Sequence, residues 1–172
     1  MKVNEIFKGR VVTLNLEEFD LPNGHTVKLE VARHLSAAAI VPVAEDGRVL
    51  LIRQFRPVLN AWLWEIPAGL LEKDEDPALC AARELEEETG WIARTVEPVT
   101  RIHSSCGFTD EVVHIFKGTG LEPGRMAREK GEVIEERFFA REEILRMIGN
   151  RQITDAKTLA GLFYVLLGNS LE

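Results

Sequence analysis

The sequence predicts an α/β protein: a sandwich in which helices cover a mixed β-sheet, with a β-hairpin added at the N-terminus. Apolar runs typical of strands come in pairs joined by short turns, and helical patterns lie between and after them. Strands paired by hairpins and mixed with helices favour this architecture. The expected elements of the main body are strands at 37–44, 48–56, 112–118 and 133–140, and helices at 77–89, 141–149 and 155–167.

The N-terminal hairpin is expected between residues 11 and 34. Apolar and polar residues alternate on both sides of residues 22–24, where an Asn-Gly pair is a strong signal for a hairpin turn. A two-stranded hairpin is marginally stable alone, so it must pack on its own chain or on a second one. We therefore divide the chain into a hairpin unit, residues 1–35, and a main domain, residues 36–172.

Composition and charge exclude several classes of function. The chain has 172 residues and a formal net charge of -7, which argues against nucleic acid as a partner. No apolar run approaches the ~20 residues that a membrane-spanning helix needs, and the first residues hold no apolar stretch typical of a signal peptide. Cys80 and Cys106 lack the spacing of a zinc site and are expected to be reduced thiols. We therefore expect a cytoplasmic protein without a membrane partner.

The helix expected at 77–89 carries the most informative pattern. Asp76 is a favourable N-cap before a proline, and Gly90 is a favourable C-terminal stop. Glu84, Glu87 and Glu88 share one face at helical spacing. Their repulsion, and the position of two of them at the negative end of the helix dipole, would be offset by a cation. Carboxylates without a thiol or imidazole suit Mg²⁺ or Mn²⁺, and a solvated acidic face is the alternative.

The spacing in this region resembles the Nudix box, G-x₅-E-x₇-R-E-U-x-E-E-x-G-U, where U is a bulky apolar residue. Trp91, at the last position, is larger than the usual aliphatic residue. Every fixed position is occupied, by Gly69, Glu75, Arg83, Glu84, Glu87, Glu88 and Gly90. By this resemblance the chain is identified as a member of the Nudix hydrolases. Members of that family use Mg²⁺ to hydrolyse a nucleoside diphosphate linked to another moiety, on an α/β/α sandwich.

The resemblance implies a role for each position of the box. The metal ligands implied are the carboxylates of Glu84 and Glu88 with the carbonyl oxygen of Ala68. Arg83 is implied to orient the carboxylates, and Glu87 to act as a ligand or as the base. The remaining fixed positions are implied to shape the motif: Gly69 lets the loop turn, Glu75 ties the loop to the helix, and Gly90 ends the helix.

Residues outside the box resemble the ADP-ribose pyrophosphatase branch of the family. The segments that carry this resemblance are I-R-Q-F-R-P at 52–57, W-E-I-P-A-G-L-L-E at 64–72 and G-F-T-D-E at 107–111, with Cys106 where that branch commonly has proline. In that branch the last of these loops covers the substrate, and the N-terminal hairpin pairs across a two-fold axis and lends residues to the partner's site. The substrate-binding residues implied are Arg56, Leu70, Ser105, Gly107, Phe108, Thr109 and Glu111.

The general base stays open between three residues. The family places one or two glutamates in the loop before the last strand, and Glu132 aligns there as a late metal ligand and a catalytic candidate. Where a second glutamate is expected this chain has Lys130, with Glu129 one residue away. Glu87 is the third candidate.

Together these features predict a dimeric, Mg²⁺-dependent hydrolase of nucleoside diphosphate sugars. The expected reaction cuts ADP-ribose to AMP and ribose 5-phosphate. The alternatives are hydrolysis of another nucleotide sugar such as GDP-mannose, or a sensor domain that binds ADP-ribose without cutting it. The complete set of carboxylates argues against a sensor, which has no need of them.

Overall fold

Three β-sheets and three helices make up the part of the chain that the computed structural model describes, residues 2–128 and 130–168. The strands are β1 (Val3–Lys8), β2 (Val12–Asp20), β3 (Thr26–His34), β4 (Ala37–Pro42), β5 (Val49–Arg56), β6 (Ala61–Glu65), β7 (Ala68–Leu70), β8 (Trp91–His103), β9 (Val112–Pro123) and β10 (Ile134–Phe139). The helices are α1 (Pro77–Thr89), α2 (Arg141–Gly149) and α3 (Ala156–Leu167).

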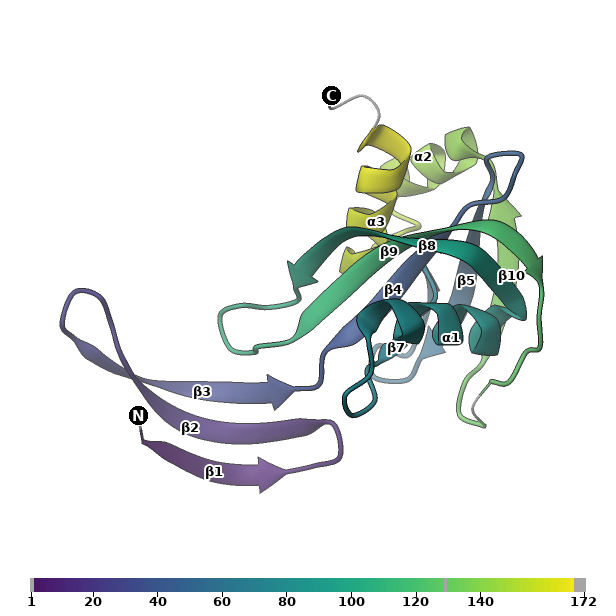
Figure 1. The fold of residues 1–172 in the computed structure, drawn as a ribbon. Coiled ribbons are helices and arrows are strands. Elements are labelled where there is room, and N and C mark those ends of the chain that lie inside the picture. Colours follow the sequence, from purple (N-terminus) through teal and green to yellow (C-terminus); the bar gives the residue numbers. More distant parts are fainter. Residues whose placement is uncertain (1, 129, 169–172) are drawn as a thin grey trace.

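The N-terminal sheet extends away from the main body (Figure 1). The predicted hairpin is present as β2 and β3, which pair antiparallel from Val12 opposite His34 to Asp20 opposite Thr26. Gly24 sits in the turn with φ 83°, a conformation that glycine adopts at no steric cost. The sequence did not predict β1, which adds a third strand on the outer edge of β2.

The main body contains the mixed sheet that the sequence predicts. Its strand order is β7-β4-β9-β8, with β4 parallel to β9 and the other pairs antiparallel. A second sheet has the order β10-β5-β6. The α/β sandwich is therefore confirmed.

Strand β4 is buried on both faces and separates two apolar cores. Ala38 and Ile40 pack with Leu85 on the side of α1, whereas Ala39 and Val41 pack with residues of the other core on the side of α2 and α3. A strand buried on both faces reads as a continuous apolar run, which is why this strand was predictable. The two cores place α1 against one face of the sheet and leave the acidic side of α1 free for the site.

Strands β6, β7 and β8 were not predicted. Strand β8 contains Pro98, a residue that disfavours strand interiors, and the register shifts between Pro98 and Thr100 to accommodate it. Strand β7 has only three residues and carries no periodicity that a pattern could show. Strand β9 continues beyond the predicted residues 112–118 to Pro123.

Helix α1 begins and ends where its capping residues predict. The Asp76 side chain accepts a hydrogen bond from the backbone N–H of Ala78 at 2.8 Å, and Gly90, at φ 73°, donates its N–H to the carbonyl oxygen of Glu86 at 2.7 Å. No helix within residues 2–128 and 130–168 is long and apolar enough to cross a membrane.

Candidate active site

A hollow of about 940 Å³ opens beside the acidic face of α1. Its walls come from the β1–β2 turn, the end of β5, strand β7 with the loop that follows it, and the loop before β10. The lining residues include Arg10, Arg56, Ala68, Gly69, Leu70, Arg83, Glu84, Glu87 and Glu132. Most of the fixed residues of the Nudix box therefore line the same hollow as Arg56 and Leu70.

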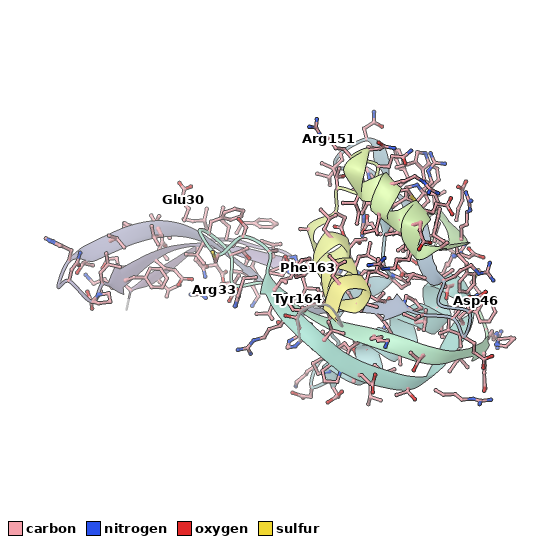
Figure 2. The ribbon with its side chains drawn as sticks, turned by 90° about the horizontal axis from the view of Figure 1, so that it is seen from above. Glu30, Arg33, Asp46, Arg151, Phe163 and Tyr164 are labelled. Atoms are coloured by element: carbon pink, nitrogen blue, oxygen red, sulfur yellow. The ribbon has the colours of Figure 1, made fainter. Side chains whose placement is uncertain are left out.

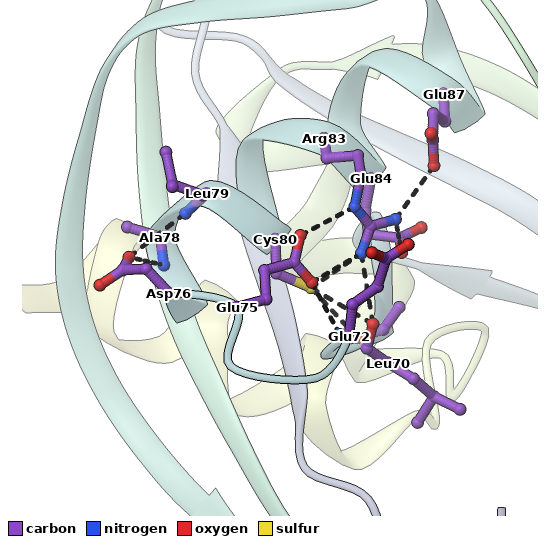
Figure 3. A network of polar contacts seen from close by, with 11 residues as sticks. Leu70, Glu72, Glu75, Asp76, Ala78, Leu79, Cys80, Arg83, Glu84 and Glu87 are labelled. Carbon is purple, nitrogen blue, oxygen red and sulfur yellow. Dashed lines mark hydrogen bonds and ion pairs between the residues drawn. The ribbon is translucent and has the colours of Figure 1, made fainter.

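Arg83 is the centre of the polar network on this face (Figure 3). Its Nη1 donates to Oε1 of Glu84 at 2.6 Å and to Oε2 of Glu87 at 3.1 Å. Its Nε and Nη2 donate to the two oxygens of Glu75, and Nη2 also reaches the carbonyl oxygen of Leu70. One guanidinium therefore fixes three carboxylates relative to the end of β7, which is the geometry that an orienting residue requires.

Glu75 joins the loop before α1 to the helix. Besides accepting from Arg83, its Oε2 accepts a hydrogen bond from the backbone N–H of Glu72 at 2.8 Å. The hydrogen bonds from Arg83 lower the pKa of Glu75 to about 2, against the opposing effect of burial. This carboxylate is therefore ionised at neutral pH and keeps the loop closed on the helix.

Gly69 is needed for space rather than for a turn. It lies within β7, opposite Ala38, and its φ is not positive. A Cβ on residue 69 would lie closer than 3.0 Å to the carboxylate atoms of Glu84. The resemblance implied that this glycine lets the loop turn; the structure corrects that role to a close approach between strand and carboxylate.

Glu88 is a buried carboxylate beneath the hollow. Its side chain is 2% exposed, and its Oε2 accepts a hydrogen bond from the backbone N–H of Ala68 at 3.1 Å. Burial raises the pKa of Glu88 well above its ordinary value, and the charges of Glu84 and Glu132 raise it further. Burial likewise raises the pKa of Glu84. The three groups are close enough to repel one another, so positive charge between them would be strongly favoured.

These carboxylates are the oxygen donors that Mg²⁺ and Mn²⁺ prefer. In residues 2–128 and 130–168, however, no three His, Cys, Asp or Glu side chains are gathered closely enough to hold an ion as they stand. Glu84 and Glu87 accept hydrogen bonds from Arg83, and Glu88 accepts one from the backbone N–H of Ala68. The donor set fits a hard divalent cation, which would compete with Arg83 for the carboxylates.

Two of the three candidate bases are described by the structure. Glu132 lines the hollow, and Glu87 lines it from α1. Glu129 lies outside the described residues. Glu132 contributes to the raised pKa of both Glu84 and Glu88, so its carboxylate lies within electrostatic reach of the cluster.

The loop at 105–111 lies elsewhere, against the N-terminal sheet. The N–H of Ala32 in β3 donates to the carbonyl oxygen of Phe108 at 2.8 Å, and the N–H of His34 donates to Oδ1 of Asp110 at 3.0 Å. The residues of this loop implied to bind substrate do not line the 940 Å³ hollow of their own chain: Ser105, Gly107, Phe108, Thr109 and Glu111. Strand β3 therefore holds the loop outside the hollow of the same chain.

Two charged residues that the sequence did not single out support Arg56. Its Nε and Nη2 donate to the two carboxylate oxygens of Glu65, which is 1% exposed, and Lys157 at the start of α3 donates to the same carboxylate. Glu65 lies in the quoted segment 64–72, but its pairing with Lys157 was not predicted, because residues 65 and 157 meet only in the folded chain.

Comparison with known proteins adds three findings. The NUDIX domain model matches residues 32–162. An ADP-ribose pyrophosphatase of Bacillus subtilis is 38% identical over 173 residues, which cover 98% of this chain and 92% of that protein. A methanol dehydrogenase activator of Bacillus methanolicus is 36% identical over 174 residues, which cover 100% of this chain and 94% of that protein.

Among solved structures, the crystal structure of an ADP compounds hydrolase superposes with a TM-score of 0.86. The alignment covers 99% of this chain and 94% of that one, at 20% sequence identity. At this identity the likeness concerns the fold, and it extends over the N-terminal sheet as well as the main body.

Proposed function

The chain belongs to the Nudix hydrolase family, and on that premise we propose that it hydrolyses the diphosphate of a nucleoside diphosphate sugar, ADP-ribose above all. The observation that carries the proposal is the set of hydrogen bonds by which Arg83 holds Glu75, Glu84 and Glu87 at one wall of the hollow. The 38% identity to an ADP-ribose pyrophosphatase supports the choice of substrate.

In the proposed reaction a water molecule attacks one phosphorus of the diphosphate. The bond from the water oxygen to that phosphorus forms as the bridging phosphorus–oxygen bond breaks, and AMP and ribose 5-phosphate are the products. A carboxylate, that of Glu132, Glu87 or Glu129, accepts the proton of the water. Arg56 binds the diphosphate, and Arg83 keeps the carboxylates of α1 in position.

We propose that Mg²⁺, or Mn²⁺ in its place, is held by Glu84, Glu88, Glu132 and the carbonyl oxygen of Ala68. Such an ion neutralises the diphosphate and lowers the pKa of water. The charge of Glu132 raises the pKa of both Glu84 and Glu88, and the charge of Glu84 raises that of Glu88. These effects support the assignment, since a cation would relieve them.

We also propose that two copies pair through the N-terminal sheet. Large apolar side chains are exposed along β1 and its neighbours, among them Val3, Ile6, Phe7, Leu14 and Leu29. An exposed apolar patch of this kind is typical of an interface. In such a dimer the loop at 105–111 would cover the hollow of the partner subunit, as its position outside its own hollow suggests. Deleting residues 1–35 should then give a monomer with little activity, measured by light scattering and turnover.

The experiment that tests the activity is a panel of nucleotide sugars with Mg²⁺, read by chromatography of the products. We expect AMP and ribose 5-phosphate from ADP-ribose, and no turnover in excess chelator. Faster cleavage of GDP-mannose would favour the alternative substrate. Binding of ADP-ribose without any cleavage, at any divalent ion tested, would identify a sensor instead. The acidic charge and the proposed substrate fit a cytoplasmic protein without a nucleic-acid or membrane partner.

A second candidate function comes from the relative that is named for activating a methanol dehydrogenase, which matches the whole length of this chain. It is tested by measuring the rate of such a dehydrogenase with and without this protein. A rate increase that Glu84→Gln abolishes would mean that both functions use the same site.

A further inference from the structure

A buried ion network joins the start of α3 to the wall of the hollow. Its centre is Glu65, the last residue of β6, whose side chain is 1% exposed. Arg56 donates to both of its oxygens, at 2.7 and 2.6 Å, and Lys157 donates to Oε2, the oxygen that also accepts from Nη2 of Arg56. Two cations therefore share one buried carboxylate, and the second of them, Lys157, is also paired with Asp155.

Lys157 is itself held in place by its helix. Its Nζ donates to Oδ2 of Asp155 at 3.1 Å, and Asp155 caps α3 by accepting from the N–H of Thr158 at 2.9 Å. The Thr158 hydroxyl in turn accepts from the N–H of Ile66 at 2.9 Å, directly after Glu65. The first turn of α3 is therefore tied to the end of β6, and the ammonium group of Lys157 is fixed beside Glu65.

Arg56 is the member of this network that reaches the site. It lines the 940 Å³ hollow, and it also lines a smaller hollow of about 370 Å³ together with Glu65, Asp155 and Lys157. Its Nε and Nη2 face Glu65, so the edge that carries Nη1 is the one that a phosphate in the hollow can meet.

The second cation matters when Arg56 meets an anion. A buried carboxylate left with one partner competes for that partner with any incoming phosphate. Burial alone would raise the pKa of Glu65, but the hydrogen bond from Arg56 and the charge of Lys157 outweigh it and keep the group ionised. With Lys157 present, Glu65 keeps a second partner while the Nη1 edge of Arg56 binds the ligand.

We propose that Lys157 is a positioning residue for substrate binding: acting through Glu65, it holds the guanidinium of Arg56 so that its free edge faces the diphosphate of the nucleotide sugar. The inference rests on the proposed function, in which Arg56 contacts that diphosphate. It predicts that Lys157 affects the affinity for substrate and has little effect on the chemical step.

The test compares Lys157→Met, Arg56→Ala and the double variant. For Lys157→Met we expect KM for ADP-ribose to rise about tenfold with kcat nearly unchanged, because a charge-assisted hydrogen bond to phosphate is weakened and the acidic cluster is intact. If Lys157 acts through Arg56, the double variant has the same KM as Arg56→Ala. Lys157→Arg, which keeps the charge, should recover most of the affinity.

Two controls separate positioning from folding and from the activity itself. Leu162→Ala, in the buried face of the same helix, should lower the melting temperature without raising KM. The affinity of each variant for ADP-ribose can also be measured by calorimetry in the presence of a chelator. This compares the variants without turnover. The proposal is overturned if Lys157→Met leaves affinity unchanged while Arg56→Ala weakens it, or if the two effects multiply. If Arg56→Ala itself leaves the affinity for ADP-ribose unchanged, Arg56 does not bind the diphosphate and this inference is wrong. The proposed hydrolysis of ADP-ribose is not contradicted by that result.

Discussion

Gly69 and Glu84 are packed so closely that no side chain fits between them: a Cβ on residue 69 would overlap the Glu84 carboxylate. We therefore expect Gly69→Ala to push that carboxylate out of position while the fold is retained, because β7 is short and lies at the edge of its sheet. A displacement of about 1 Å in a catalytic group can lower the rate about 10²-fold. Measuring kcat for ADP-ribose with saturating Mg²⁺ tests this expectation.

Gly149→Ala is the matched control, since a Cβ at that position meets no atom within 4 Å. It should leave kcat unchanged. An active Gly69→Ala variant would mean that Glu84 does not need the position it has in this structure.

The carboxylates of α1 should affect turnover more than substrate binding. We expect Glu84→Gln and Glu88→Gln each to lower kcat about 10²-fold or more, with a small change in KM, because each removes a charge that holds the ion. Glu86→Gln is the control on the same helix: its carboxylate accepts a hydrogen bond from the backbone N–H of Arg125, and Glu86 does not line the hollow. Normal turnover in either of the first two variants would remove that residue from the metal site.

The fold was predictable where local signals are strong. Asp76 and Gly90 mark the two ends of α1, and the apolar run of β4 marks a strand buried on both faces. The strands that escaped prediction have weaker signals: β1 adds to an edge with exposed side chains, and β8 is interrupted at Pro98. Long-range pairing stabilises them, and pairing of that kind leaves no mark in a short window of sequence.

The site was predictable to the extent that its chemistry lies within one motif. The spacing of the Nudix box brought Arg83 and its carboxylates together, because a loop and one helix hold them all. The pairing of Glu65 with Lys157 could not be found in this way, since the two residues are 92 positions apart. The reason for Gly69 was also hidden, because a close approach between two elements depends on packing.

Acid should weaken the N-terminal sheet through Glu17. This carboxylate is 1% exposed, and the hydrogen bond from Arg33 lowers its pKa in the folded state. Its contribution to stability is therefore complete above the unfolded pKa of about 4.3 and is lost as the pH falls through the lower, folded pKa. We expect Glu17→Gln to have a lower melting temperature than the wild type at pH 7, with the difference shrinking below pH 4. Melting curves of both proteins between pH 7 and pH 3 measure this difference in melting temperature. A difference that stays constant over this pH range would mean that ionisation of Glu17 is not its cause.

If the loop at 105–111 serves the partner's hollow, inactive subunits should complement each other. Glu84→Gln disables the acidic cluster of its own chain, and Phe108→Ala disables the loop, whose Phe108 is 56% exposed. A mixed dimer of the two has one site with both parts intact, so we expect it to regain up to about half of wild-type activity per dimer. Differently tagged subunits, co-expressed and purified through both tags, give that dimer. No activity above the two parent dimers would mean that each loop serves its own chain.

The general base is the last assignment to test, and the two glutamates of the loop before β10 offer a direct comparison. Glu132 lines the hollow and acts electrostatically on Glu84 and Glu88. Lys130 stands where a second glutamate would be expected from the family pattern, which shifts Glu129 by one position.

We therefore expect Glu132→Gln to lower kcat about 10²-fold or more, within the 10²–10⁴-fold that a positioned base contributes. Glu129→Gln should lower kcat only slightly. The competing possibility is that the loop closes on the substrate and brings Glu129 to the water, as mobile loops do in other enzymes. In that case the two variants exchange ranks. Turnover of both at saturating ADP-ribose and Mg²⁺ decides between them, and Glu87→Gln, measured alongside, shows whether the base lies on α1 instead. A large loss at Glu129 with near-normal Glu132 would place the base three residues earlier in the loop than the sequence pattern indicates.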